Sequence, residues 1–168
     1  MQQTQFGNGD LDRIVLLMNS VGNRYSRNAN RILAAKKLNC QTAHVLSLLI
    51  DATKVRCRVL ADIGGFEATA LSRILGTLEK QALIVRQRVK KDNRAVEVHL
   101  TRKGRLVARE CQAIAGQLQG AMLAGLSGDE MEKLSRFLTS MNLQMARAFA
   151  SDKVSSSGRL PAPPPKPR

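Results

Sequence analysis

The hydrophobic period of this 168-residue chain changes at Gln81-Ala82. Before this point, four apolar residues follow the i, i+3, i+4, i+7 spacing of one helical face: Leu71, Ile74, Leu75 and Leu78. After it, the segments 84–89 and 95–100 alternate with a period of two on either side of a polar stretch, 90–94. The pattern predicts an amphipathic helix that is followed directly by a β-hairpin.

A further helix is predicted over 55–63, and it stops at Gly64-Gly65, where two glycines allow a tight turn. Helix, turn, amphipathic helix and hairpin are together the elements of a winged helix-turn-helix. The polar face of the second helix carries short side chains and cations that suit the DNA major groove: Thr69, Ser72, Arg73, Thr77 and Lys80. Arg73 can bond two acceptors on a guanine edge.

The predicted hairpin is strongly basic. Between residues 86 and 94 it holds five cations and one acid, a net charge of +4: Arg86, Arg88, Lys90, Lys91 and Arg94, with Asp92. The whole chain has a formal net charge of +14, which makes a polyanion the first partner class to consider. Only 3% of residues are aromatic, and stacking on single-stranded bases needs aromatics, so double-stranded DNA is favoured.

Long helices are predicted on both sides of this region. The first runs over 10–35, and a second begins at Asn39 or Thr42. Thr101 suits the N-cap of a helix that follows the hairpin.

The last helix starts from a capping box formed by Ser127 and Glu130. Its apolar stripe has alternating spacings of four and three, which is typical of a coiled-coil seam: Leu134, Leu138, Met141, Met145 and Ala148. Such a stripe is more apolar than a lone terminal helix needs, so we expect it to be a dimer seam.

The segment from Val59 to Gly104 resembles the MarR-type (multiple antibiotic resistance regulator) transcriptional regulators without a gap. The most specific part is Asp92-x-Arg94, with a strand and Leu100-Thr101-x-x-Gly104 after it. The resemblance implies a homodimer with interleaved terminal helices, the helix near 67–80 in the major groove and Arg94 in the minor groove. Asp92 would orient the wing through Arg73 or a neighbouring backbone group.

The fold class expected from these features is mainly α, with about six helices and a small β-hairpin wing. The expected domain organisation is a flexible N-terminus (1–9), an N-terminal dimerisation helix (10–38), a winged helix-turn-helix lobe (39–104), C-terminal dimerisation helices (105–150) and a disordered Ser/Pro-rich tail (151–168).

Two positions depart from the family pattern. The family usually has a glycine in place of Ala82, and that glycine ends the recognition helix in a left-handed conformation. This conformation costs alanine about 1–2 kcal/mol, so we expect the helix to end differently here. Gly76 lies in mid-helix, where glycine costs about 0.5–1 kcal/mol relative to alanine.

Members of the family commonly bind small anionic aromatic ligands between the dimer helices and the DNA-binding lobe. Candidates for such a pocket supply cations for a carboxylate and rings for stacking: Arg24, Tyr25, Arg27 and His44. Other members sense peroxides through a cysteine. Cys57 lies among cations that would lower its pKa: Lys54, Arg56 and Arg58. With two His residues and no Cys-x-x-Cys, neither a metal site nor a cofactor is expected.

The leading hypothesis is a dimeric, sequence-specific DNA-binding regulator, a repressor that a ligand releases from a palindromic operator. An architectural DNA binder without sequence preference and a redox-responsive regulator are the alternatives. An enzyme is disfavoured because phosphate-loop and nucleophile-elbow motifs are missing. Three widely spaced cysteines indicate reduced thiols and a cytoplasmic location. No apolar run approaches the ~18 residues of a membrane span, so no membrane partner is expected.

Overall fold

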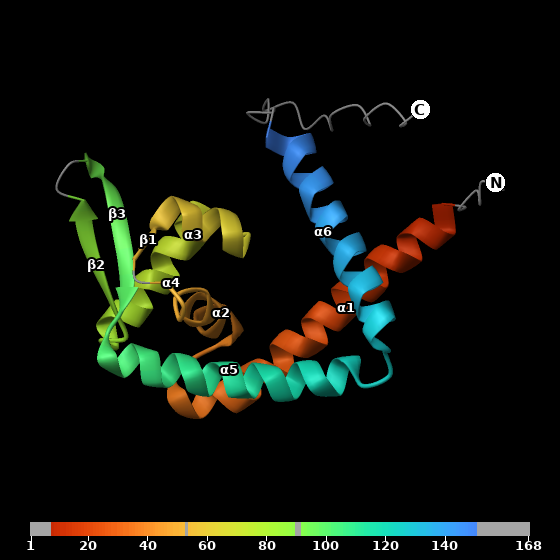
Figure 1. The fold of residues 1–168 in the computed structure, drawn as a ribbon, viewed down its shortest axis with the longest axis horizontal. Coiled ribbons are helices and arrows are strands. Elements are labelled where there is room, and N and C mark those ends of the chain that lie inside the picture. The colour runs from red at the N-terminus through yellow and green to blue at the C-terminus, as the bar shows by residue number, and fades with distance from the viewer. Residues whose placement is uncertain (1–7, 53, 90–91, 151–168) are drawn as a thin grey trace. The chain divides into compact units, whose positions relative to one another are not determined.

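The computed structural model describes residues 8–52, 54–89 and 92–150, and it separates into two compact units, 1–121 and 122–168. The expected tail at 151–168 and most of the expected flexible N-terminus therefore lie outside the described residues. The helices of the first unit, in chain order, are α1 (Asn8–Leu33), the short 3-10 helix η1 (Ala34–Lys36), α2 (Cys40–Leu48), α3 (Cys57–Gly64), α4 (Ala68–Lys80) and most of α5 (Arg102–Leu123) (Figure 1). The second unit contains α6 (Gly128–Ala150).

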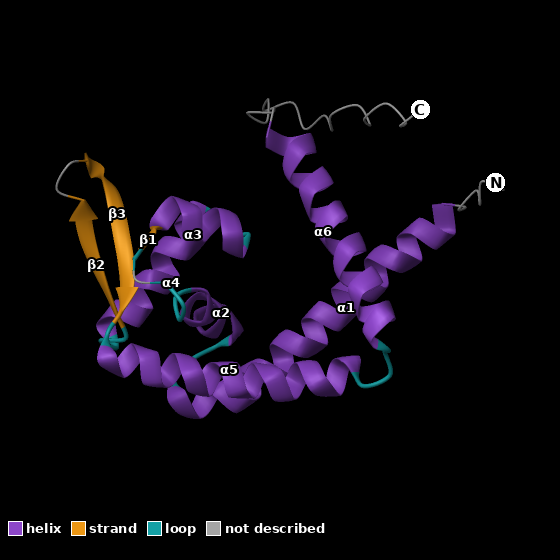
Figure 2. Ribbon diagram, viewed as in Figure 1, coloured by secondary structure: helices purple, strands orange, loops and turns teal. Residues whose placement is uncertain are grey.

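An antiparallel sheet of three strands follows the order β1-β3-β2 (Figure 2). The predicted hairpin is confirmed as β2 (Ile84–Val89) and β3 (Asp92–Leu100), with Ile84 opposite Leu100. β3 begins at Asp92, so residues 92–94, which the sequence pattern placed in the polar stretch between the strands, belong to the strand. The third strand, β1 (Val55–Arg56), is a correction, because the sequence pattern assigned these residues to a helix. They pair with Val98 and Glu97, since the outer edge of β3 presents unpaired backbone groups that a passing extended segment can satisfy.

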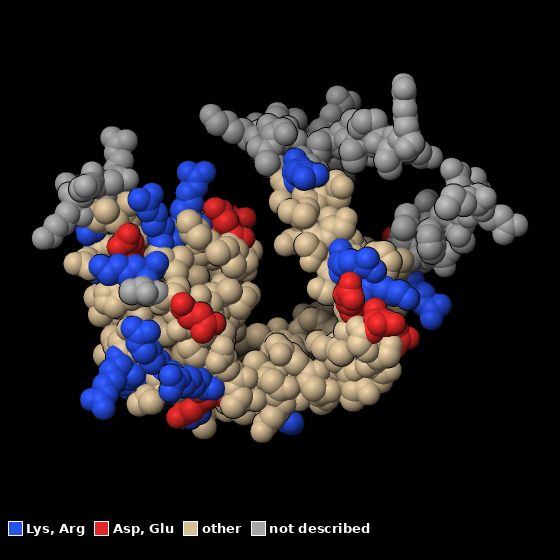
Figure 3. Space-filling view, in the orientation of Figure 1, with Lys and Arg blue, Asp and Glu red and all other residues tan. Residues whose placement is uncertain are grey.

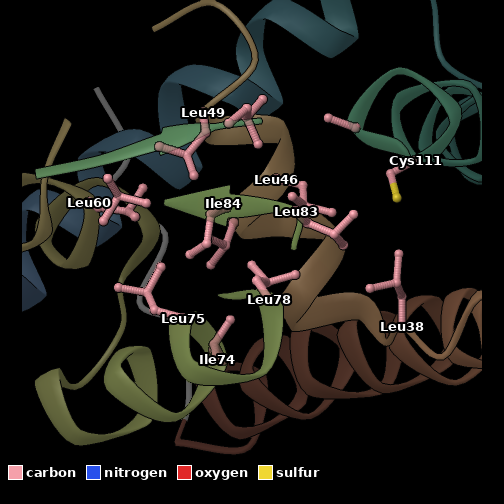
Figure 4. Close-up of a cluster of buried hydrophobic side chains, with 14 of the residues drawn as sticks. Leu38, Leu46, Leu49, Leu60, Ile74, Leu75, Leu78, Leu83, Ile84 and Cys111 are labelled. Atoms are coloured by element: carbon pink, nitrogen blue, oxygen red, sulfur yellow. The ribbon is translucent and has the colours of Figure 1, made fainter. Parts of the chain in front are cut away.

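The core of the first unit lies between the helices and the inner face of this sheet (Figure 4). All four members of the predicted stripe of α4 are buried: Leu71, Ile74, Leu75 and Leu78. They pack with residues from α2, α3 and the sheet, such as Leu46, Leu60 and Ile84. Full burial of each such side chain contributes about 1.5–3 kcal/mol to the free energy of folding. Ile84 is buried and Val85 is 42% exposed, so one face of the sheet covers the core.

Both candidate start residues of α2 take part in one cap. Asn39 is the N-cap, and its side chain accepts a hydrogen bond from the Thr42 backbone N–H at 2.9 Å. The Thr42 hydroxyl in turn accepts from the Asn39 N–H at 2.8 Å. The turn after α3 is closed by Gly65 in the left-handed region, as the double glycine predicted.

The end of α4 differs from the sequence-based expectation. Ala82 does adopt the left-handed conformation, with φ +56°. Its N–H donates to the carbonyl of Glu79 at 2.9 Å, and the N–H of Leu83 donates to the carbonyl of Leu78 at 3.0 Å, which is the Schellman pattern. Leu78 and Leu83 are both buried, and this packing and bonding offset the strain at Ala82.

The caps of the two C-terminal helices are confirmed. The Thr101 hydroxyl accepts from the Gly104 N–H at 2.9 Å at the start of α5. Before α6, the Glu130 carboxylate accepts from the Ser127 N–H at 2.8 Å, and the pKa of Glu130 is lowered by these backbone and hydroxyl bonds from Ser127. No described helix is long and apolar enough to cross a membrane.

Candidate nucleic-acid interface

The outward face of α4 carries all five residues predicted for the major groove. They are exposed, whereas the opposite face of the same helix is buried in the core: Thr69, Ser72, Arg73, Thr77 and Lys80. The Thr77 hydroxyl donates to the carbonyl of Arg73 at 3.1 Å, which orients this side chain along the helix. The face therefore offers short polar groups and two cations on a rigid support.

Gly76 has no side chain, so the backbone of α4 is uncovered at this position. A Cβ built at this position would have no heavy atom within 4 Å. Packing inside the lobe therefore does not require a glycine here. The helix backbone at Gly76 is open to the approach of another molecule.

One wing cation is held inside the lobe. Arg86 of β2 pairs with Glu79 of α4 through two hydrogen bonds to the same carboxylate oxygen, the one from Nε being 2.8 Å long. The guanidinium bonds hold the pKa of Glu79 below its usual range, and the carboxylate raises that of Arg86. This pair, which the sequence reasoning missed, ties the wing to the recognition helix and leaves Arg86 less free to meet DNA.

Of the other residues predicted for the wing, the structure describes the side chain of only one. Arg88 is exposed on β2. Lys90 and Lys91 lie outside the described residues, and Asp92 and Arg94 are described only as part of the backbone of β3. The expected contact between Asp92 and Arg73 therefore stays a prediction.

A groove of about 740 Å3 lies beside α4, between α3 and the sheet. Its floor is apolar, with Phe66, Leu71 and Leu75, and Ser72 opens onto it from α4. The charged residues that line it are Arg56, Arg58, Arg86 and Asp62. Arg56 and Arg58 were not predicted as site residues, although the dense basic cluster at 54–58 is a sequence signal for them. In the view of Figure 3, Lys and Arg side chains are spread over the part of the molecule that holds the sheet.

Two of the four residues predicted for a ligand pocket lie together. Arg24 and Arg27 line a recess on α1 beside Asn23 and Leu16. This recess does not include Tyr25 or His44.

The other two predicted pocket residues face different neighbours. Tyr25 is half-buried, and burial and the nearby Cys40 raise its pKa. A hydrogen bond with the Gln119 side chain lowers this pKa in part. The His44 ring packs on Phe66 with a centroid distance of 5.4 Å, and burial lowers its pKa. The described structure thus does not gather the four residues into one site.

The expectation for Cys57 is wrong. Burial raises the pKa of its thiol, and the nearby Arg86 opposes this only in part, so the thiolate is disfavoured. All three cysteines are free, and burial also raises the pKa of Cys111. Within the described ranges, no group of three His, Cys, Asp or Glu residues is arranged to hold a metal ion.

Comparison with known proteins places the chain in a family. Residues 28–111, half of the chain, match the family model described as transcriptional regulator SarA/Rot. The crystal structure of the transcriptional regulator SlyA superposes with a TM-score of 0.75 at 19% identity, over 80% of this chain and 94% of that one.

Two further structures agree in fold. A mutant MarR from E. coli, complexed with operator DNA, gives a TM-score of 0.69 at 23% identity over 79% of this chain and 95% of that one. CouR from Rhodococcus jostii, bound to p-coumaroyl-CoA, gives a TM-score of 0.69 at 22% identity, over 77% of this chain and 91% of that one. The chain therefore belongs to the SarA/Rot transcriptional regulators and has the winged-helix fold of the MarR-type regulators.

Proposed function

We propose that this chain is a sequence-specific, double-stranded DNA-binding regulator that acts as a homodimer on a palindromic operator. The observation that carries the proposal is α4, which has a buried apolar face and an exposed face of short polar and cationic side chains. A helix of this kind, in second place in a helix-turn-helix, reads base edges in the major groove. The family of transcriptional regulators to which the chain belongs supports this role.

The homodimer is inferred from one exposed apolar helix in each unit. On α6 the predicted seam is 38–60% exposed: Leu134, Leu138, Met141 and Met145. On α1 a run of apolar residues is also exposed: Ile14, Val15, Leu16, Leu17, Met18 and Val21. Contiguous apolar surface of this kind marks an interaction site, and a second copy of the chain brings a matching surface.

Base readout is tested first through Arg73. The operator is obtained by selection from a random duplex pool, and binding is then measured on that operator and its single-base variants. Arg73→Ala should lose about 1–3 kcal/mol of discrimination at one base pair in each half-site. Arg105→Ala, which removes an exposed cation from α5, is the matched control and should keep the preference. A loss that is equal for every sequence would assign Arg73 to phosphate contacts.

The wing is tested through Arg94, which we place in the minor groove. Arg94→Ala should weaken operator binding strongly, with lost preference confined to A·T-rich flanks where the groove is narrow. Unchanged affinity would exclude this role. An architectural binder is distinguished in the same titrations, because bulk DNA would then compete as well as the operator does.

We infer that the effector is a small anionic aromatic molecule and that it binds in the groove beside α4. The groove joins an apolar floor with Phe66 to the cations Arg56 and Arg58. A molecule there would lie against Ser72 on the DNA-reading helix, so it would compete with DNA directly. The p-coumaroyl-CoA bound to CouR is a precedent in a protein of the same fold.

The effector proposal is tested with p-coumarate as the probe. Adding it should weaken operator binding by the wild type, and Arg58→Ala should reduce this response more than it reduces operator binding itself. Arg105→Ala is again the control. Equal responses of the wild type and Arg58→Ala would place the effector site elsewhere, and no response of the wild type would exclude p-coumarate as the effector.

A further inference from the structure

Two residues other than glycine have positive φ in the described part of the chain, Lys37 and Ala82, both at +56°. Lys37 follows η1, at the end of the long α1 segment, and Ala82 follows α4. Backbone strain of this kind persists only where the surrounding structure over-determines the conformation, and it concentrates at functional positions. Each closes a helix end in the same local way: the Lys37 N–H donates to the Ala34 carbonyl at 2.9 Å and the Leu38 N–H to the Leu33 carbonyl at 3.2 Å, which is the Schellman pattern also seen at Ala82 and Leu83.

Gln81 joins these two helix ends. Its side-chain Nε2 donates to the carbonyl of Lys37 at 3.1 Å. This bond satisfies a carbonyl at the end of the α1 segment with a donor from the end of α4. Gln81 is half-buried, and its exit from α4 is fixed by the Schellman pattern at Ala82 and Leu83.

The start of α5 holds the same end of α4 from another direction. Lys103 Nζ donates to the carbonyl of Gln81 at 3.0 Å, and the Thr101 hydroxyl donates to that of Ala82 at 2.8 Å. Gly104 lets α5 approach so closely that a Cβ there would lie 1.8 Å from the Leu83 carbonyl oxygen. The end of α4 is thus bonded to the start of α5 and to Lys37, which follows α1 and η1, and the bond to Lys37 depends on the Gln81 side chain.

We propose that Gln81 is a positioning residue that sets the direction of the recognition helix relative to α1. A 13-residue helix is about 20 Å long, so a small tilt about its C-terminal end displaces the base-reading residues Thr69, Ser72 and Arg73 near its other end. In the homodimer of the proposed function, on which this inference rests, the two α4 helices meet two half-sites. Gln81 therefore determines the half-site spacing that the dimer accepts, and not the bases that it reads.

The experiment is selection of bound sites from a random duplex DNA pool, with each variant as the full-length protein. Gln81→Met keeps the length of the side chain and removes the donor, whereas Gln81→Lys restores a donor at the same place. Gln112→Ala, on the exposed face of α5, is the control. The readouts are the half-site motif and the distribution of distances between paired half-sites.

We expect wild type, Gln81→Lys and Gln112→Ala to select one spacing. Gln81→Met should select the same half-site motif. The frequency of the wild-type spacing, relative to spacings one base pair shorter or longer, should fall about two- to tenfold, which is the equilibrium equivalent of one net hydrogen bond. A Gln81→Met distribution equal to the wild type would overturn the inference, even if thermal unfolding showed a lower Tm. A wild type that selects no paired half-sites would instead overturn the proposed homodimer on a palindrome.

Discussion

Ala82 shows at the scale of one residue how packing overrides a local preference. The left-handed conformation costs alanine about 1–2 kcal/mol, and the side chain at this position is exposed and packs on little. Ala82→Gly should therefore stabilise the protein by about 0.5–1 kcal/mol, after the extra backbone entropy of glycine is subtracted. Thermal or denaturant unfolding measures the change. Ala113→Gly, an exposed position inside α5, should move stability in the opposite direction, and a decrease for both variants would contradict the explanation.

Gly104 is the opposite case, a glycine that the tertiary contact requires. A Cβ would lie 1.8 Å from the carbonyl oxygen of Leu83, and backbone cannot move aside as a flexible side chain can. Gly104→Ala should destabilise the protein by about 2 kcal/mol or more, as overpacked sites do. Gly116→Ala on the same helix meets no atom within 4 Å and should be stabilising. Unfolding curves of equal midpoint for the two variants would show that the close approach at Gly104 is not a constraint.

At the scale of elements, the Glu79–Arg86 pair connects α4 to the wing. The pKa of Glu79 is lower in the folded than in the unfolded state, so the stabilisation is present above the unfolded value of about 4.3 and is lost as the pH falls through the folded value. Both side chains are at least one-third exposed, so the pair contributes at most about 1 kcal/mol.

Glu79→Gln should therefore lower the free energy of unfolding at pH 7 by up to that amount. The difference from the wild type should disappear in the acid range, where the wild-type carboxylate is itself protonated. Denaturant titrations of both proteins at a series of pH values measure it. A difference that stays constant down to low pH would mean that the charge of Glu79 is irrelevant.

At the scale of the whole molecule, the exposed seam of α6 has to be covered for the chain to work as proposed. Leu138 is 42% exposed in the single chain. Leu138→Glu would bury a charge against a second copy, with a large desolvation cost, so it should give monomer or aggregate and severely weakened operator binding. Ser140→Glu adds the same charge away from the seam and should stay dimeric. Light scattering coupled to size-exclusion chromatography measures the molar mass of both variants. A stable Leu138→Glu dimer would show that the seam of α6 is not part of the dimer interface.

Features that depend on short segments could be predicted from the residue pattern alone. The spacing of Leu71, Ile74, Leu75 and Leu78 predicted α4 and its buried face, and alternation predicted the hairpin. Thr101 and the Ser127–Glu130 box marked helix starts correctly, because a cap needs only a side chain and the backbone three residues away. The exposed face of α4 followed from the same period, since the residues between buried positions must face outward.

Features that depend on contacts distant in sequence could not be predicted in this way. Strand β1 forms because the edge of β3 is there to pair with it, and Arg86 is held because Glu79 lies opposite on α4. The neighbouring cations suggested a lowered pKa for Cys57, but burial outweighs them and raises it. The carbonyl of the left-handed Ala82 accepts from the Thr101 hydroxyl, 19 residues further along the chain, at 2.8 Å. In each case the deciding free energy comes from a partner that local propensity does not include.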